Sequence, residues 1–173
     1  KYQRPEDYLF ANGADPAVQR IVKKARPRVR FPKLPAPLRP IVRQNLGTHY
    51  ESSVALGVAV ARHFGIPMRS IRRVLERFKG LEGREQEIAA IRGVRFINDT
   101  TSTVPDATVA AIERFRRRAG KNQLILIAGG QDKNLNFQEM ARSITQSTDA
   151  LALLPGSATK KIKNQIAKIK KNG

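Results

Sequence analysis

The apolar run Leu124-Ile125-Leu126-Ile127-Ala128 ends in Gly129-Gly130-Gln131-Asp132-Lys133. A short apolar run that is bounded by turn residues is typical of a buried β-strand. The two glycines allow the backbone to approach a ligand, and the lysine offers a point charge to a carboxylate or a phosphate. Glycine turns also follow strands that bind nothing, so a plain turn is the alternative. The stretch predicts a strand with a candidate ligand site at its carboxyl end.

Strands and helices alternate on both sides of this run. The predicted strands are residues 94–97, 123–128 and 150–154. The predicted helices are residues 106–118, residues 137–147 and a lysine-rich segment that ends near Lys171. Buried strands that are joined through single helices form a parallel sheet with helices on its faces. Because ligands bind at the carboxyl ends of such strands, the residues after Ile97, Ala128 and Leu154 are the candidates for chemistry.

The first half of the chain has a different pattern. Residues 8–11 are expected to form a short strand. Asp15 can cap a helix that begins with Pro16 and continues to about Ala25. Residues 27–40 carry five prolines, so extended or looped chain is expected there and not a helix.

Two further helices are expected before residue 80. Residues 51–64 are rich in Ala and Val on most sides, which is typical of a buried helix, and Gly65 ends it. Apolar side chains then recur at helical spacing, at Ile71, Val74, Leu75 and Phe78. This amphipathic helix should pack its apolar stripe against the Ala/Val helix.

Positive charge dominates the composition: 33 Lys+Arg stand against 14 Asp+Glu, which gives a formal charge of +19. Basic clusters occupy residues 23–30, 114–118 and 160–171, and such patches attract anions. In the last cluster, isoleucines at helical spacing predict a helix that lies on a core with its lysines in water. A nucleic-acid-binding arm is the less favoured interpretation, because three Tyr, seven Phe and no Trp leave few rings to stack on bases.

Several classes of protein are excluded by composition. The absence of cysteine excludes a disulfide framework, a thiolate zinc site and a cysteine nucleophile. No apolar run approaches the ~18 residues of a membrane span. Without an initiator Met or a leader, the chain is expected to be an internal piece of a cytoplasmic protein. Neither G-x-x-x-x-G-K-[ST] nor G-x-G-x-x-G occurs, so the chain by itself has no usual triphosphate-binding loop.

Polar residues outside the Gly129–Lys133 region give two further candidates. The run Asn98-Asp99-Thr100-Thr101-Ser102-Thr103 follows a predicted strand and can hold magnesium, a ribose or a phosphate, although capping of the helix at Asp106 explains it equally well. His49 lies where a loop enters a helix and can meet an anion there, with capping or packing as the favoured alternative. His63, next to Phe64, is expected to be structural.

In their order along the chain, these pieces resemble the Mur ligases, the ATP-dependent amide ligases of peptidoglycan synthesis. The resemblance covers nearly the whole chain, and within the family it points to the enzymes that add D-glutamate. The asparagine, aspartate and hydroxyl run after a strand distinguishes those enzymes from their relatives. Four motifs carry the resemblance: Leu46-Gly47-Thr48-His49, Phe78-Lys79-Gly80-Leu81-Glu82-Gly83-Arg84, Val94-Arg95-Phe96-Ile97-Asn98-Asp99-Thr100 and Ile127-Ala128-Gly129-Gly130-Gln131-Asp132-Lys133.

The resemblance implies an α/β fold with two domains in this chain. Residues 1–79 would be the C-terminal part of the central ATPase domain. Residues 80–173 would be the amino-acid-binding C-terminal domain, a Rossmann-like, mostly parallel sheet with helices on both faces, truncated at its end. The UDP-binding domain, the P-loop and the carbamylated lysine would lie upstream of Lys1, and the segment that completes the glutamate pocket would lie beyond Gly173. By itself the chain would then be an incomplete, inactive enzyme.

The implied reaction joins D-glutamate to UDP-N-acetylmuramoyl-L-alanine. ATP and Mg²⁺ are used to activate the alanyl carboxylate as an acyl phosphate, and the amine of D-glutamate then attacks it. Clustered cations suit these anionic substrates and the phosphoryl transition state. The Mg²⁺ ligands would lie mostly upstream, and no residue of this chain is assigned to the metal. The enzyme is expected to be a cytoplasmic monomer that acts on small molecules and does not bind a membrane.

The resemblance also implies roles for individual residues. Arg84 and Asp99 would contact ATP, the arginine at a phosphate and the aspartate around the ribose or the arginine. His49 and Ser53 fall at the start of the helix with which the family contacts the nucleotide. The incoming D-glutamate would be bound by Thr103 and by Lys133, the latter through a carboxylate.

The chain differs from the family motifs at four positions. Tyr50 and Ser53 replace asparagines, Gly83 replaces the histidine before the arginine, and Thr101 replaces a lysine in the strand-end motif. These changes remove two amides and a cation, which weakens the adenine and phosphate contacts.

Two other functions are consistent with the sequence. One is a related amide ligase of the folylpolyglutamate type, which the amino-acid dependence of ADP release would distinguish. The other is a basic nucleic-acid-binding or scaffold module on the same fold, which would bind nucleic acid with a steep salt dependence. The ligase is preferred, because motifs at strand ends carry more information than net charge.

Overall fold

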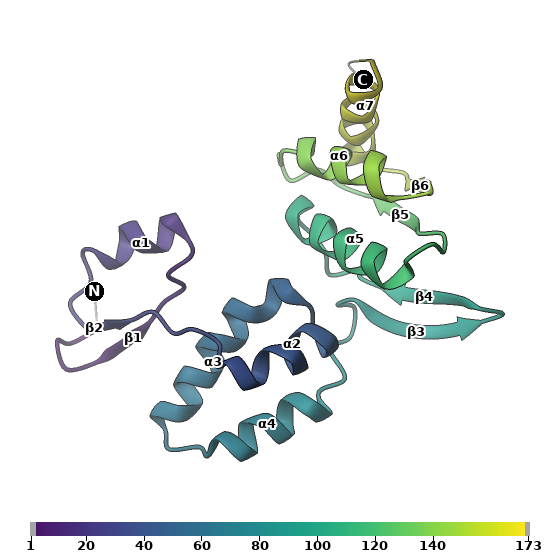
Figure 1. The fold of residues 1–173 in the computed structure, drawn as a ribbon. Coiled ribbons are helices and arrows are strands. Elements are labelled where there is room, and N and C mark those ends of the chain that lie inside the picture. The colour runs from purple at the N-terminus through teal and green to yellow at the C-terminus, as the bar shows by residue number, and fades with distance from the viewer. Residues whose placement is uncertain (1–2, 172–173) are drawn as a thin grey trace. The chain divides into compact units, whose positions relative to one another are not determined.

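The computed structural model describes residues 3–171 (Figure 1). The backbone divides into two compact units, Lys1–Gly80 and Leu81–Gly173, and each has an apolar core of its own. Unit 1 contains β1 (Tyr8–Phe10), α1 (Pro16–Val22), β2 (Arg28–Arg30), the 3-10 turn η1 (Ala36–Leu38), α2 (Arg39–Asn45), the 3-10 turn η2 (Thr48–Tyr50), α3 (Glu51–His63) and α4 (Met68–Arg77). Unit 2 contains β3 (Gln86–Ile91), β4 (Val94–Asn98), α5 (Pro105–Ala119), β5 (Ile125–Gly129), α6 (Gln138–Ser147), β6 (Ala150–Leu154) and α7 (Ser157–Lys171).

The first elements of unit 1 form as the sequence predicts. Strands β1 and β2 pair in parallel. The carboxylate of Asp15 caps α1 by accepting the backbone N–H groups of Ala17 and Val18 at 2.7 and 3.2 Å. Pro16 occupies the first turn, and the helix ends at Val22, somewhat before its expected end.

The proline-rich segment is only partly extended. It includes β2 and η1, but α2 begins at Arg39 with Pro40 in its first turn, where no helix was expected. Proline is compatible with a first helical turn, because the N–H that it lacks has no intrahelical partner there. The last proline of the segment therefore marks the start of α2 instead of excluding it.

The core of unit 1 consists of Leu34, Leu38, Val42, Ala55, Val58 and Ile71. It joins α2, α3 and α4, so the predicted packing of α4 is confirmed for Ile71 and for Leu75, which packs against this core. Two residues of the predicted stripe differ: Val74 is 64% exposed, and Phe78 follows the end of α4. The expectation that α3 is buried on most sides was wrong. Val60 is 39% exposed and the following Phe64 is 76% exposed, because the described part of the chain covers only one side of this helix.

The strands of unit 2 differ from the predicted sheet. β3 and β4 form an antiparallel hairpin around Arg92-Gly93, whereas β5 and β6 pair in parallel. β3 was missed because Gln86–Ile91 has no alternation of apolar and polar residues. Residues 94–97 do form a strand, but the hairpin makes this strand antiparallel to its neighbour.

The three helices of unit 2 share one apolar cluster, whose buried members are Ile112, Phe137, Met140, Ile144, Ala158 and Ile162. Leu126 and Leu151 of the β5–β6 pair pack against this cluster. On the other side of the pair, Ile125 and Ile127 are 60% and 66% exposed, since successive strand residues point to opposite faces. The expected helices on both faces of the sheet are therefore not found within residues 3–171.

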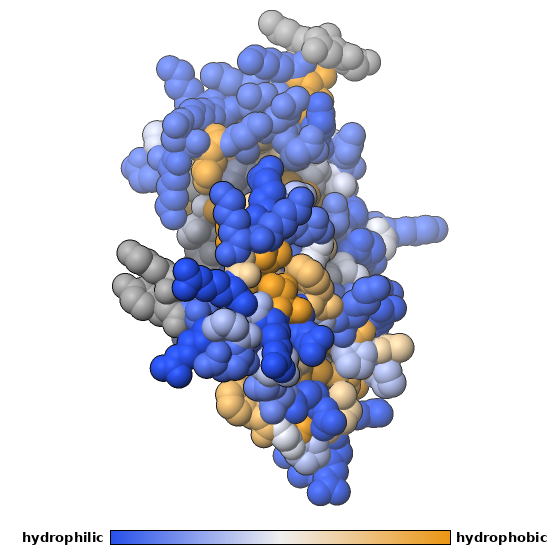
Figure 2. Space-filling model, turned by 90° about the vertical axis from the view of Figure 1, so that its left-hand side faces the viewer, coloured by the Kyte–Doolittle hydropathy of each residue, from blue (hydrophilic) through white to orange (hydrophobic). Residues whose placement is uncertain are grey.

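The lysine-rich helix forms as predicted. In α7 the side chain of Ile162 is only 1% exposed, whereas Lys160 and Lys163 lie in solvent. Figure 2 shows hydrophilic side chains over much of the face in view, with apolar patches between them. In the part of the chain that the structure describes, no helix combines the length and the apolar character that crossing a membrane requires.

Candidate functional site

The loop before β3 is fastened to the loop after β4. The carbonyl oxygen of Gly83 accepts the backbone N–H of Thr101 at 3.0 Å and its hydroxyl at 2.7 Å. Asp99 Oδ1 accepts the backbone N–H of Glu85 at 3.0 Å. These bonds fix the backbone on both sides of Arg84, whose side chain is exposed. The structure thus places the predicted residues Arg84 and Asp99 in one hydrogen-bonded pair of loops.

Gly83 and Thr101, two of the positions at which the chain differs from the family motifs, are in contact. Gly83 has φ +69°, a conformation that favours glycine. A Cβ atom at this position would lie 3.0 Å from Cγ2 of Thr101, so there is little space for a larger residue. The sequence shows two separate differences, and only the tertiary contact shows that they are coupled.

A buried ion pair anchors the same loop to α5. The carboxylate of Glu85 pairs with the guanidinium of Arg114, and their side chains are only 5% and 11% exposed. An ion pair that is removed from water holds its partners firmly, because separation would leave a buried charge uncompensated. Sequence reasoning missed both residues, since nothing in a local pattern links positions that are 29 residues apart.

Some side chains of the polar run Asn98–Thr103 form hydrogen bonds near their own positions in the chain. Asn98 Oδ1 accepts the N–H of Thr100 at 3.2 Å, and the hydroxyls of Ser102 and Thr108 lie 3.2 Å apart. The residue that precedes α5 makes no side-chain cap, so the capping alternative describes only part of the run. Thr103 is exposed and, within residues 3–171, its hydroxyl has no hydrogen-bond partner, which leaves it available to a ligand.

The loop after β5 is built around Asp132. Its Oδ1 atom accepts the backbone N–H of Leu135 at 3.2 Å, and its Oδ2 atom lies 2.5 Å from Nζ of Lys161 in α7. The backbone N–H of Asp132 donates to Oγ of Ser157 at 2.8 Å. The ammonium of Lys161, followed by the backbone N–H of Leu135, lowers the pKa of the Asp132 carboxyl. The loop therefore has a defined shape and is tied to the first turns of α7.

Lys133 is the next residue of this loop. Its side chain is exposed, and among the described residues its ammonium has no ion-pair partner. Asn134, which follows it, has φ +60° and turns the chain toward α6. A cation held on a shaped loop at a strand end is suited to bind a carboxylate or a phosphate.

The other predicted residues are not joined to this loop. No hydrogen bond or ion pair connects Thr103 with Lys133 in the described chain. His49 and Ser53 belong to unit 1, in η2 and the first turn of α3, and both are exposed. The ring centroids of His49 and Tyr50 lie 4.3 Å apart.

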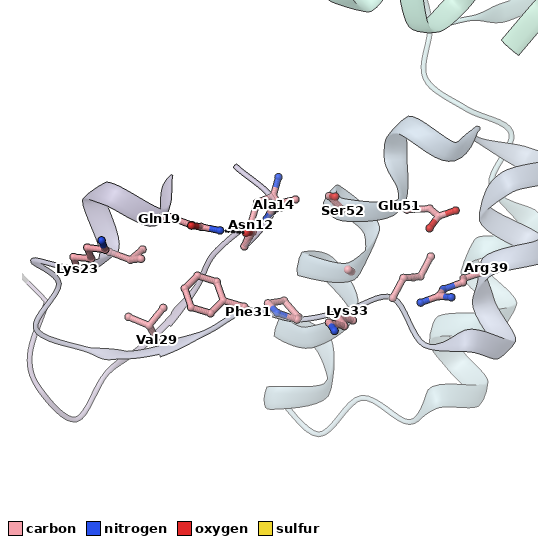
Figure 3. A pocket seen from close by; sticks show the side chains of 15 residues that line it. Asn12, Ala14, Gln19, Lys23, Val29, Phe31, Lys33, Arg39, Glu51 and Ser52 are labelled. Atoms are coloured by element: carbon pink, nitrogen blue, oxygen red, sulfur yellow. Dashed lines mark hydrogen bonds between the residues drawn. The ribbon is translucent and has the colours of Figure 1, made fainter. Parts of the chain in front are cut away.

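Unit 1 contains a cavity that the sequence did not indicate. It has a volume of about 800 Å³ and lies between the β1–α1 turn, β2 and the start of α3. Figure 3 shows the ring of Phe31 in the middle, with Lys23 toward one side and Arg39 toward the other. Ser52 lines the cavity but the predicted Ser53 does not, because neighbouring helix residues point in different directions.

A metal centre is not built from the described residues. Among them, no group of three or more His, Asp or Glu side chains lies close enough to hold a metal ion. Asp99 already accepts a backbone hydrogen bond, and Asp132 is paired with Lys161. The loops after β4 and β5 and the loop before β3 present exposed cationic and hydroxyl groups on a fixed backbone. Such an arrangement is suited to binding anions.

No protein-family model matches the chain. It is 38% identical over 120 residues to the UDP-N-acetylmuramoylalanine–D-glutamate ligase of Roseiflexus sp. (strain RS-1), over 69% of this chain and 25% of the relative. The ligase of the same name from Borreliella afzelii is 36% identical over 129 residues, or 71% of this chain and 28% of the relative. A third, from Desulfitobacterium hafniense (strain DCB-2), is 28% identical over an alignment of 179 positions, which covers 90% of this chain and 38% of the relative.

The chain therefore spans about a quarter to two fifths of the length of the curated relatives that it matches. The similarity extends over both units, since the longest of these alignments covers 90% of the chain. By sequence, the chain is thus a homologue of a segment of the UDP-N-acetylmuramoylalanine–D-glutamate ligases, within the Mur ligase family.

Proposed function

We propose that the protein to which this chain belongs is an ATP-dependent ligase that adds D-glutamate to UDP-N-acetylmuramoyl-L-alanine in peptidoglycan synthesis. The observation that carries the proposal is the similarity to ligases of that name, at 36–38% identity over 69–71% of the chain. The anion-binding loops of unit 2 support it, because the substrates are carboxylates and phosphates.

The proposed domain assignment follows the resemblance. Residues 1–79 are the C-terminal part of the ATPase domain, and residues 80–173 belong to the amino-acid-binding domain, with a Rossmann-like arrangement in the complete protein. The division of the backbone between Gly80 and Leu81 supports this boundary. The enzyme acts in the cytoplasm as a monomer on small-molecule substrates.

In this proposal the loops of unit 2 orient the two substrates. Arg84 binds a phosphate of ATP, and Asp99 holds the backbone next to that arginine through the N–H of Glu85. For His49 and Ser53 of unit 1, the resemblance to the Mur ligases is the support for a nucleotide contact. Mg²⁺ neutralises phosphate charge when it is bound, and we assign none of its ligands to the described residues.

Lys133 and Thr103 bind the D-glutamate. Lys133 pairs with a carboxylate of the amino acid, which places the amine for attack on the activated alanyl carboxyl group. The exposed ammonium of Lys133 supports its role. The role of Thr103 is supported by its hydroxyl, which has no hydrogen-bond partner within residues 3–171. No proton acceptor for the attacking amine is assigned within this chain.

The test is D-glutamate-dependent ADP release by the complete protein. Lys133→Ala should raise the KM for D-glutamate about tenfold or more, because a charge-assisted hydrogen bond is worth about 1.5–3 kcal/mol. The KM for ATP should change by less than about twofold, since Lys133 does not contact ATP in this proposal. Lys121→Ala, which removes an exposed lysine after α5, is the matched control and should leave both values unchanged.

Two results would contradict the proposal. A uniform loss of affinity for both substrates in Lys133→Ala would remove the assignment of Lys133. ADP release that depends on another amino acid, with D-glutamate inert, would point to an amide ligase of the folylpolyglutamate type.

A further inference from the structure

The loop that carries Lys133 is held by α7 through one face of that helix. Ser157 and Lys161 are four residues apart in α7, so both lie on the same side of its first two turns. Ser157 Oγ accepts the N–H of Asp132 at 2.8 Å and donates to Oε1 of Gln131 at 2.9 Å. Nζ of Lys161 lies 2.5 Å from Oδ2 of Asp132.

Asp132 connects this helix face to the far end of the loop. Its second carboxylate oxygen accepts the N–H of Leu135 at 3.2 Å, beyond Lys133. The side chain of Asp132 is 14% exposed and that of Lys161 is 45% exposed, so the pair is partly screened from water. The backbone before Lys133 is therefore held by Ser157, and the backbone after it is held by the Asp132 carboxylate, which Lys161 in turn holds.

We propose that Lys161 is a positioning residue for the amino-acid substrate: its ion pair with Asp132 holds the 129–135 loop so that Lys133 meets a substrate carboxylate in a fixed place. Lys161 itself does not touch the substrate. This inference rests on the proposed function, because it takes the D-glutamate carboxylate as the partner of Lys133.

Preorganisation explains why such a pair matters for binding. A lysine ammonium on a mobile loop would have to be ordered when the carboxylate binds, and that cost would appear as lost affinity. With the loop already tied to α7, only the side chain of Lys133 has to be ordered. Loss of Lys161 should therefore weaken binding of the amino acid while leaving the nucleotide unaffected.

The test uses the complete protein and four variants. Lys161→Ala and Asp132→Asn each remove the ion pair, and the asparagine keeps an oxygen that can still accept the N–H of Leu135. Both should raise the KM for D-glutamate about fivefold and leave the KM for ATP unchanged. A fivefold change corresponds to the upper end of the range of free energies that partly exposed ion pairs contribute. Lys161→Arg should restore most of the affinity, since guanidinium also pairs with a carboxylate. Lys163→Ala removes a neighbouring exposed lysine of α7 and should behave like the unaltered protein.

The double variant of Lys161→Ala and Asp132→Asn gives a sharper criterion. If the two residues act through one ion pair, the double variant is no worse than either single variant. Additive losses, a normal KM in Lys161→Ala, or an equal effect of Lys163→Ala would each overturn the inference.

Hydrogen exchange of the complete protein separates failure of this inference from failure of the proposed function. If the unaltered protein shows no D-glutamate-dependent ADP release, the proposed function fails. Exchange of the amides of residues 131–135 then decides whether the ion pair holds the loop. Faster exchange in Lys161→Ala than in Lys163→Ala supports the positioning role, and equal exchange overturns it.

Discussion

Replacing Gly156 with alanine should destabilise unit 2 strongly. Gly156 has φ +153° and lies between β6 and α7, and an alanine Cβ would lie 2.1 Å from the carbonyl oxygen of Gly130. That contact is with backbone, which cannot rotate away as a side chain can. To relieve it, the loop after β5 must move away from the start of α7.

The cost can be worked from the bonds that this movement breaks. The N–H of Ala158 donates to the carbonyl of Gly130 at 3.0 Å, and the N–H of Asp132 donates to Ser157 at 2.8 Å. Each bond is worth about 1 kcal/mol, and the strained backbone of an alanine at this φ adds a similar amount. The free energy of unfolding of unit 2 should therefore fall by about 3 kcal/mol.

Urea unfolding with two probes measures this change. All tyrosines of the chain, Tyr2, Tyr8 and Tyr50, precede residue 80, so tyrosine fluorescence reports on unit 1, whereas far-UV circular dichroism reports on both units. Gly156→Ala should shift the dichroism transition to lower urea and leave the tyrosine transition in place. Gly57→Ala is the control, because Gly57 lies within helix α3 and no atom of the described residues comes within 4 Å of the position that the new Cβ would take.

This control should stabilise unit 1 by about 0.5–1 kcal/mol, since alanine is the better helix former. A loss of less than about 1 kcal/mol in Gly156→Ala would refute the reasoning, because the strained φ alone is expected to cost that much. An equal shift of the tyrosine transition would also refute it.

Two further outcomes are expected in unit 2. Glu85→Ala should lower the free energy of unfolding by about 3 kcal/mol, because it leaves the charge of Arg114 buried, and adding Arg114→Met should recover much of that loss in urea unfolding followed by circular dichroism. The backbone N–H of Leu124, followed by the guanidinium of Arg116, lowers the pKa of the Asp149 carboxyl in the folded state. Its stabilising effect is therefore complete above the ordinary aspartate pKa of about 3.9 and disappears as the pH falls through the lowered folded-state value. Asp149→Asn should make the acid dependence of unfolding shallower between neutral pH and about pH 2, whereas a pH dependence unchanged by Asp149→Asn would contradict this assignment.

The sequence predicts those elements whose ends and buried faces are determined by residues close together in the chain. The cap at Asp15, the stripe that includes Ile71 and the buried Ile162 of α7 each depend on residues within a few positions of one another. Helical spacing and capping act over one or two turns, so a linear pattern contains the information. The same holds for strands β5 and β6 and for the motifs that indicate the ligase family.

Missed elements lacked such a pattern or carried a misleading one. β3 has no alternating residues, and its pairing with β4 depends on a hairpin that the sequence analysis did not predict. α2 has a proline, Pro40, in its first turn, and proline also suggests a loop. The orientation of β4 followed from the hairpin and not from its own residues, which is why a parallel strand was expected there.

The motifs of the sequence determined which residues of this protein are candidates for ligand binding, since Arg84, Asp99, Thr103 and Lys133 all lie in loops at strand ends. Only the tertiary structure decided what holds them. Asp99 supports the backbone beside Arg84, and the loop of Lys133 is tied to α7 through Asp132. The physical reason is that hydrogen bonds and ion pairs depend on distance in space. Chain folding brings together Asp132 and Lys161, which no local pattern connects.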